Sequence, residues 1–296
     1  MKPAPFQYHA PTTVDEAVGL LTELGDEAKV LAGGQSLVPM LNLRLARFEH
    51  LVDIGRIGEL RGSARQNGSL VVGAGTRDSV IELDPTVAAA VPLLAKVTPY
   101  IGHFQIRNRG TIGGSLAHAD PAAEYPAVAV ALDATFDIVS SGGSRTVPAA
   151  DFFDGVWSTS LEDGELLRSI AFPVWGGRSG FGVAEFARRH GDFAIAGAVA
   201  AVELGPDDVV VRSAMSIFGV AGTPTRATST EAALAGRPSA EIDPDVVGRS
   251  AMDAIEDVSD DPQVPSGYRR RIGAAMVADA WRRAVDDARL NDGSPR

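Results

Sequence analysis

The segment Ala32-Gly33-Gly34-Gln35-Ser36 stands between an expected strand at residues 29–31 and an expected short helix at residues 37–45. Paired glycines let backbone N–H groups approach a ligand closely, and a serine beside a helix N-terminus adds donors, as in backbone phosphate sites. The same five residues could equally form a tight strand–helix turn without a ligand. A Walker A loop is excluded, because no Gly-Lys-Ser/Thr follows, and the segment lacks the G-x-G-x-x-G dinucleotide fingerprint.

A capped helix stands before this segment and a strand after it. Thr13-Val14-Asp15-Glu16 has the pattern of a capping box, and apolar residues at helical spacing follow it as far as Gly25. A further strand is expected at residues 50–54. Residues 1–55 are therefore predicted to form a small β-α-β-α-β unit.

A second glycine pair lies in Thr111-Ile112-Gly113-Gly114-Ser115 and is again flanked by hydroxyl side chains. Residues 105–121 show no clear period, so we predict loop or buried turn there. Two such segments can bracket one extended ligand, whose charge would be neutralised by backbone dipoles instead of by lysine. Glu124 follows shortly, and a carboxylate at that place can accept the two hydroxyls of a ribose.

The rest of the chain divides near Pro173, where Pro and Gly cluster between two apolar segments. Before this point we expect strands at residues 69–74 and 166–172, a hairpin at 135–147, and helices at 76–83, 86–97 and 122–132. Beyond it, apolar runs at residues 181–188, 194–204 and 209–220 predict a three-stranded meander. Helices are expected near residues 244–256 and 268–290, so the fold class is α+β in two parts.

Composition excludes several classes of function. The chain has 296 residues, a net charge of −11 and no cysteine. Without cysteine it has no disulfide, no zinc–thiolate site and no iron–sulfur cluster of its own. An acidic chain with scattered arginine is a poor nucleic-acid binder. No apolar run is long enough to span a membrane, and the N-terminus lacks an apolar signal core, so we expect a cytoplasmic protein.

Three segments together, the two glycine pairs and Arg188-Arg189-His190-Gly191-Asp192-Phe193-Ala194, carry a family resemblance. In order and spacing the chain resembles the FAD-binding medium subunits of the molybdenum hydroxylases, the carbon monoxide dehydrogenase and xanthine dehydrogenase flavoprotein family. The resemblance covers nearly the whole chain. It implies a two-lobed FAD-binding domain of the vanillyl-alcohol-oxidase (PCMH) type at residues 1–175, with lobes at about 1–55 and 60–175. A smaller α+β domain at residues 178–290 would follow.

The resemblance also implies roles for individual residues. It assigns the FAD pyrophosphate to the two glycine segments, the ribose side to Glu124, and the neighbourhood of the flavin to apolar positions and to the Gly-Asp-aromatic segment. Two positions depart from the family pattern, since Glu124 replaces the usual Asp and Phe193 the usual Tyr. The cofactor-binding residues expected on this basis are Ala32, Gly33, Gly34, Gln35, Ser36, Leu37, Ile101, Thr111, Ile112, Gly113, Gly114, Ser115, Glu124, Leu166, Leu167, Asp192 and Phe193. No catalytic side chain and no metal ligand is predicted.

The implied function is electron transfer through noncovalently bound FAD. A large partner chain would carry the molybdenum cofactor and a small one two [2Fe–2S] clusters, in a dimer of heterotrimers. The flavin would pass electrons to an external acceptor. Two alternatives stay open from the residues: a stand-alone flavoenzyme that acts directly on an organic substrate, and a cofactor-free binding or assembly protein.

Overall fold

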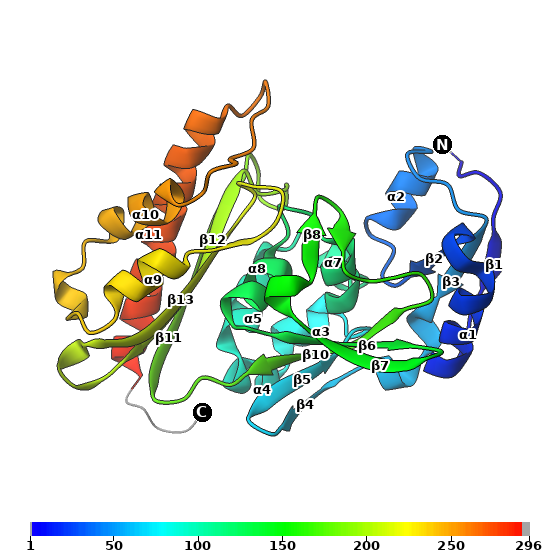
Figure 1. Ribbon diagram of the computed structural model, residues 1–296, viewed down its shortest axis with the longest axis horizontal. Coiled ribbons are helices and arrows are strands. Elements are labelled where there is room, and N and C mark those ends of the chain that lie inside the picture. The colour runs from blue at the N-terminus through cyan, green and yellow to red at the C-terminus, as the bar shows by residue number, and fades with distance from the viewer. Residues whose placement is uncertain (1, 292–296) are drawn as a thin grey trace.

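The computed structural model describes residues 2–291 and begins with a small parallel unit (Figure 1). Its strands β1 (Gln7–His9), β2 (Ala28–Leu31) and β3 (His50–Asp53) form a parallel sheet in the order β1-β3-β2. Helices α1 (Val14–Leu24) and α2 (Leu37–Asn42) connect them. The predicted β-α-β-α-β unit is confirmed. Thr13 caps α1 by accepting from the Glu16 N–H at 3.2 Å.

A five-stranded antiparallel sheet forms the second unit, in the order β4-β5-β10-β6-β7. Its strands are β4 (Ser63–Gln66), β5 (Ser69–Gly73), β6 (Thr135–Ser140), β7 (Gly143–Pro148) and β10 (Leu166–Pro173). Around it lie α3 (Asp78–Leu83), α4 (Pro85–Ala90), α5 (Pro92–Val97), α8 (Glu124–Ala131) and the hairpin of β8 (Phe153–Gly155) and β9 (Ser158–Thr159). The helical stretch expected at residues 86–97 is split, because Pro92 cannot continue α4 and instead begins α5.

The prediction of loop or buried turn for residues 105–121 is wrong. The segment holds α6 (Phe104–Arg107) and α7 (Ile112–His118). The glycine pair occupies the first turn of α7. It interrupts the helical spacing of apolar residues, and glycine is a poor helix former, so the sequence pattern did not indicate a helix. Thr111 nevertheless caps α7, since its Oγ1 accepts from the Gly114 N–H at 3.1 Å. Gly113 is required by packing, because a Cβ there would lie 2.6 Å from the Ala74 carbonyl oxygen.

The C-terminal part is an antiparallel sheet covered by helices on one side (Figure 1). The predicted meander is present as β11 (Arg178–Phe186), β12 (Ala196–Leu204) and β13 (Val210–Phe218), with β14 (Thr225–Arg226) added at the edge. Helices α9 (Thr228–Leu234), α10 (Pro244–Asp253) and α11 (Ser266–Leu290) follow. Gly182 lets α11 approach, because a Cβ at this position would lie 2.8 Å from the Ala284 nitrogen.

The other face of this sheet packs on the second unit. Phe181, Val183 and Val199 join the same apolar core as residues of α5 and α8. The α+β fold class, with an N-terminal two-lobed part and a smaller part built on an antiparallel meander, is therefore confirmed. Within residues 2–291, no helix is long and apolar enough to cross a membrane.

Candidate cofactor site

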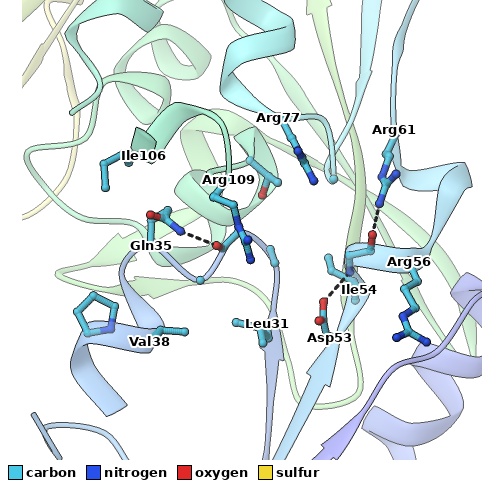
Figure 2. Close-up of a pocket in the computed structure, with 17 residues that line it drawn as sticks. Leu31, Gln35, Val38, Asp53, Ile54, Arg56, Arg61, Arg77, Ile106 and Arg109 are labelled. Atoms are coloured by element: carbon cyan, nitrogen blue, oxygen red, sulfur yellow. Dashed lines mark hydrogen bonds between the residues drawn. The ribbon is translucent and has the colours of Figure 1, made fainter. Parts of the chain in front are cut away.

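A cavity of about 550 Å³ opens between the parallel unit and the five-stranded unit (Figure 2). The β2–α2 connection and the end of β3 supply one wall, and the β5–α3 and α6–α7 connections supply the other. Its lining residues are Leu31, Ala32, Gly33, Gly34, Gln35, Val38, Pro39, Asp53, Ile54, Gly55, Arg56, Arg61, Gly75, Arg77, Ile106, Arg109 and Thr111. Of the residues expected from the sequence, the cavity thus brings together Ala32, Gly33, Gly34, Gln35 and Thr111.

The first glycine segment offers free backbone donors. In the described part of the chain, the N–H groups of residues 33–36 have no hydrogen-bond acceptor. Gly34 has a φ of +73°, which favours glycine and turns the chain into α2. The Gln35 side chain donates to the Gly33 carbonyl at 2.9 Å and fixes the turn from inside. Unpaired amides beside a cavity suit an anionic group such as a diphosphate.

The second glycine segment contacts the first but presents different groups. A Cβ on Gly33 would lie 2.7 Å from the Gly110 Cα, and one on Gly114 would lie 3.4 Å from the Ala32 Cβ. The α7 amides are already used: Ile112 donates to Thr76, Gly113 to Ala74 and Gly114 to Thr111. This wall therefore lines the cavity mainly with the side chains of Arg109 and Thr111. In the described part of the chain the Thr111 N–H has no acceptor, whereas those of residues 112–114 do.

Four arginines give the cavity a positive lining that the sequence pattern did not predict. They are Arg56, Arg61, Arg77 and Arg109. Arg61 donates to the Gly55 carbonyl, as Figure 2 shows. The other three form no ion pair with any residue in 2–291. Unpaired guanidinium groups that face a cavity in a chain of net charge −11 indicate an anionic ligand.

The one carboxylate of the lining does not neutralise these arginines directly. Asp53 Oδ2 accepts from the Tyr8 hydroxyl at 2.5 Å, and Oδ1 accepts from the Gly55 N–H at 2.8 Å. Both oxygens are thus engaged in holding the end of β3. Free amides on one wall and the unpaired guanidinium groups of Arg77 and Arg109 on the other fit the diphosphate of a dinucleotide such as FAD. The volume suits part of such a ligand.

Glu124 lies outside this lining, at the first residue of α8. Burial, and next the nearby carboxylate of Glu185, raise the pKa of Glu124 to about 8. Burial also raises the pKa of Glu185 to about 7, and its Oε2 has no hydrogen-bond partner within the described chain. Glu124 belongs to helix α8 and Glu185 to strand β11. At neutral pH, Glu124 is mostly protonated and Glu185 is close to its midpoint of titration.

These acids predict a pH-dependent stability of the FAD-free protein. Unfolded Glu124 ionises near its ordinary value of 4.5, so the unfolded chain loses a proton that the folded chain keeps. Stability should therefore fall as the pH rises from about 5 to about 8. Glu124→Gln should raise the melting temperature at pH 8 with little effect at pH 5, measured by circular dichroism. The exposed Glu241→Gln is the control, and an equal gain at both pH values would show that the buried proton of Glu124 is not the cause.

The remaining expected residues lie away from the cavity lining. Ile101 is half-buried against the main core, and Leu166 and Leu167 are buried strand residues of β10. Their expected contact with the flavin stays a prediction, as does the expected contact of Glu124 with the ribose side of the cofactor. So do the roles of Ser36, Leu37, Ile112, Gly113, Gly114 and Ser115, which stand beside the lining residues in the two glycine segments.

The Gly-Asp-Phe segment forms the connection between β11 and β12. Asp192 pairs with Arg189 at 3.3 Å, and the Phe193 side chain is 73% exposed. Gly191, with a φ of +83°, lies against the His103 ring, where any Cβ would collide. Phe193 is therefore not an anchor in the interdomain core, and its ring is free to face a ligand or a partner.

Comparison with known proteins gives this site a context. Residues 4–175 match the family described as FAD binding domain in molybdopterin dehydrogenase. Residues 182–284 match the CO dehydrogenase flavoprotein C-terminal domain. The chain is 38% identical over 277 residues to the carbon monoxide dehydrogenase medium chain of Hydrogenophaga pseudoflava, covering 94% of this chain and 96% of that one.

Two further proteins show the same likeness over the full length. The chain is 36% identical over 288 residues to the caffeine dehydrogenase subunit beta of Pseudomonas sp. (strain CBB1), covering 97% of each. Among solved structures, a chain of the Cu,Mo-CO dehydrogenase in its cyanide-inactivated form superposes with a TM-score of 0.93 at 33% identity. That superposition covers 97% of this chain and 100% of the other.

Proposed function

Because this chain belongs to the family of FAD-binding medium subunits of molybdenum hydroxylases, we propose that it transfers electrons between partner chains and an external acceptor. Electrons would arrive from [2Fe–2S] clusters on a small chain, after substrate oxidation at a molybdenum centre on a large chain. The cavity of free amides and unpaired arginines, placed between the two lobes of the FAD-binding fold, is the observation that carries the proposal.

The residues of this chain would hold the cofactor and supply no reacting group. FAD, when bound, supplies the one- and two-electron chemistry, and the protein supplies its position and electrostatic surroundings. The amides of residues 33–36 and the guanidinium groups of Arg77 and Arg109 would hold the diphosphate. Binding would be noncovalent, since the chain has no cysteine and none of its five dispersed histidines lies in a recognised flavin-linkage motif. Acid precipitation should therefore release the flavin into the supernatant.

Exposed aromatic side chains support a docking face near the flavin end. Phe104 is 62% exposed and follows His103, which contacts the segment that carries Phe193. Large exposed apolar side chains on adjoining segments favour an interface. We place the small iron–sulfur chain at this face, in a dimer of heterotrimers.

The function is tested by electron delivery. The small chain is reduced with dithionite, desalted, and mixed under argon with the FAD-loaded protein while flavin absorption is followed. Rapid bleaching is expected, and oxidised small chain is the control. Absence of bleaching, together with flavin reduction of the isolated subunit by an organic substrate of the complex, would support the stand-alone flavoenzyme instead. A purified chain that takes up no FAD would support the cofactor-free alternative.

Phe193→Ala tests whether this ring shields the flavin. Because the side chain is exposed, the substitution should leave the melting temperature of the FAD-free protein nearly unchanged. It should weaken FAD binding modestly, since a stacked aromatic contact is typically worth about 0.5–1.5 kcal/mol, and speed reoxidation of reduced flavin by dioxygen in stopped-flow experiments. Phe193→Tyr should behave like the wild type. Unchanged reoxidation in FAD-saturated Phe193→Ala would refute the shielding role.

A further inference from the structure

Helix α3 contacts the α6–α7 connection, which forms part of one wall of the cavity. The Asp78 N–H donates to the Gly110 carbonyl at 3.1 Å. The Asp78 side chain is 3% exposed, and its Oδ2 packs so closely on Gly110 that any Cβ there would collide with it. The position of Gly110, and with it that of Arg109 and Thr111, therefore depends on the N-terminal end of α3.

The next turn of the same helix carries an ion pair. Glu82 Oε2 accepts from Arg107 Nε at 2.8 Å, and Oε1 accepts from Nη2 at 3.4 Å. The Arg107 side chain is 12% exposed, so water screens this pair only weakly. Arg107 does not line the cavity and is not a solvated surface residue. Its partner shows that it belongs to the internal framework of the second unit.

Arg107 uses its remaining donor group to hold a turn. Nη1 donates to the carbonyl oxygens of Ile101 at 3.2 Å and Gly102 at 3.3 Å. Gly102 has a φ of +48°, so the turn has a backbone conformation that benefits from such support. A planar guanidinium can reach Glu82 and both carbonyls at once, whereas a lysine ammonium cannot.

The supported turn continues into the segment that contacts the β11–β12 connection. The His103 ring lies against Gly191, and the ring centroids of His103 and His190 are 5.9 Å apart. Ile101, Asp192 and Phe193 are the residues that the family resemblance assigns to the flavin. A continuous series of contacts thus runs from α3 through Arg107 to the expected flavin end of the site.

We propose that the Glu82–Arg107 ion pair is a positioning device that fixes the flavin end of the site relative to the diphosphate end. The inference rests on the proposed function, because it takes FAD as the ligand. The diphosphate end depends on Asp78, Gly110 and the first glycine segment, and the flavin end depends on Arg107. Loss of the pair should therefore affect recognition of the flavin while leaving recognition of the diphosphate intact.

Arg107→Lys separates the two ends when FAD and ADP are compared as ligands. ADP carries the adenosine diphosphate but no flavin. Calorimetry on FAD-free full-length protein should show ADP affinity unchanged within about twofold and FAD affinity reduced about tenfold, since charge-assisted hydrogen bonds are lost only at the flavin end. The visible spectrum of bound FAD should also shift towards that of free FAD.

Arg226→Lys is a matched control. Arg226 likewise pairs with an acid on a nearby helix, Glu231 at 2.6 Å, and donates to a backbone carbonyl, that of Val130 at 2.7 Å. It is 19% exposed and lies outside the cavity. Its substitution should lower the melting temperature without changing the ratio of FAD to ADP affinity or the flavin spectrum.

Two outcomes for Arg107→Lys would overturn the inference. One is that FAD and ADP affinities fall by the same factor, and the other is that both affinities and the spectrum of bound FAD stay as in the wild type. If Arg107→Lys does not fold, Glu82→Asp keeps the charge and shortens the acid by one methylene, and the same shift in ratio is expected. Wild-type protein that binds ADP but not FAD would instead refute the proposed function, so the two failures are distinguishable.

Discussion

Gly33→Val is expected to abolish the retention of FAD while much of the fold persists. The side chain at residue 33 would enter the space occupied by the backbone of the α6–α7 connection, because even a Cβ would lie 2.7 Å from the Gly110 Cα. Backbone cannot move aside as the end of a flexible side chain can. The two walls of the cavity would separate, and the amides of residues 33–36 would no longer face Arg109. FAD content after gel filtration is the measurement, with circular dichroism as the test of folding.

Gly19→Ala is the matched control for this change. Gly19 lies within α1, where an added Cβ meets no atom within 4 Å, so alanine should stabilise the helix by about 0.5–1 kcal/mol without affecting FAD. Gly114→Val should have a smaller effect than Gly33→Val, since the nearest neighbours of its Cβ are side-chain atoms of Thr111 and Ala32. Stoichiometric, tightly bound FAD in Gly33→Val would contradict the contact between the two walls.

The sequence pattern predicted that the two glycine segments bracket one ligand, because glycine pairs can be recognised locally in the chain. Each glycine pair interrupts the apolar period of the sequence and could be recognised from it. In the structure the two segments lie side by side, since Gly33 approaches Gly110 and Gly114 approaches Ala32. The helix α7 was missed because its first turn contains that very pair. Glycine lowers helix propensity, while the reason for glycine at position 113 is a contact with Ala74, which no local pattern reveals.

The arginines were missed for a different reason. Arg77 and Arg109 are ordinary polar residues in the sequence, and an acidic chain suggested that backbone dipoles alone would neutralise the ligand. Which arginines lack an acidic partner is decided by long-range packing. Arg107 pairs with Glu82 and points into the interior of the second unit. Arg109, two residues later, lines the cavity. Only the fold distinguishes the arginine of the internal framework from the arginine that lines the cavity.

Arg77→Gln and Arg109→Gln should each weaken FAD and ADP by the same factor, in contrast to Arg107→Lys. Both arginines line the cavity without an ion pair in the described chain, so they are available for the diphosphate. Hydrogen bonds to charged groups are worth about 1.5–3 kcal/mol, which corresponds to a loss of about tenfold to a hundredfold for each substitution.

The dependence of ligand affinity on ionic strength distinguishes the loss of a charge contact from a change in the shape of the cavity. Wild-type affinity for ADP should fall as ionic strength rises. A variant that carries both Arg77→Gln and Arg109→Gln should show a shallower dependence, because fewer charges remain to be screened. Arg249→Gln, at an exposed position of α10, makes the same change in net charge as either single substitution. It lies outside the lining and should leave both affinity and salt dependence unchanged. Equal effects of Arg249→Gln and Arg109→Gln would mean that the net charge of the chain, and not a clamp on the diphosphate, controls binding. A loss confined to FAD, with ADP unaffected, would place Arg77 and Arg109 at the flavin end and reverse the assignment of the two ends of the site.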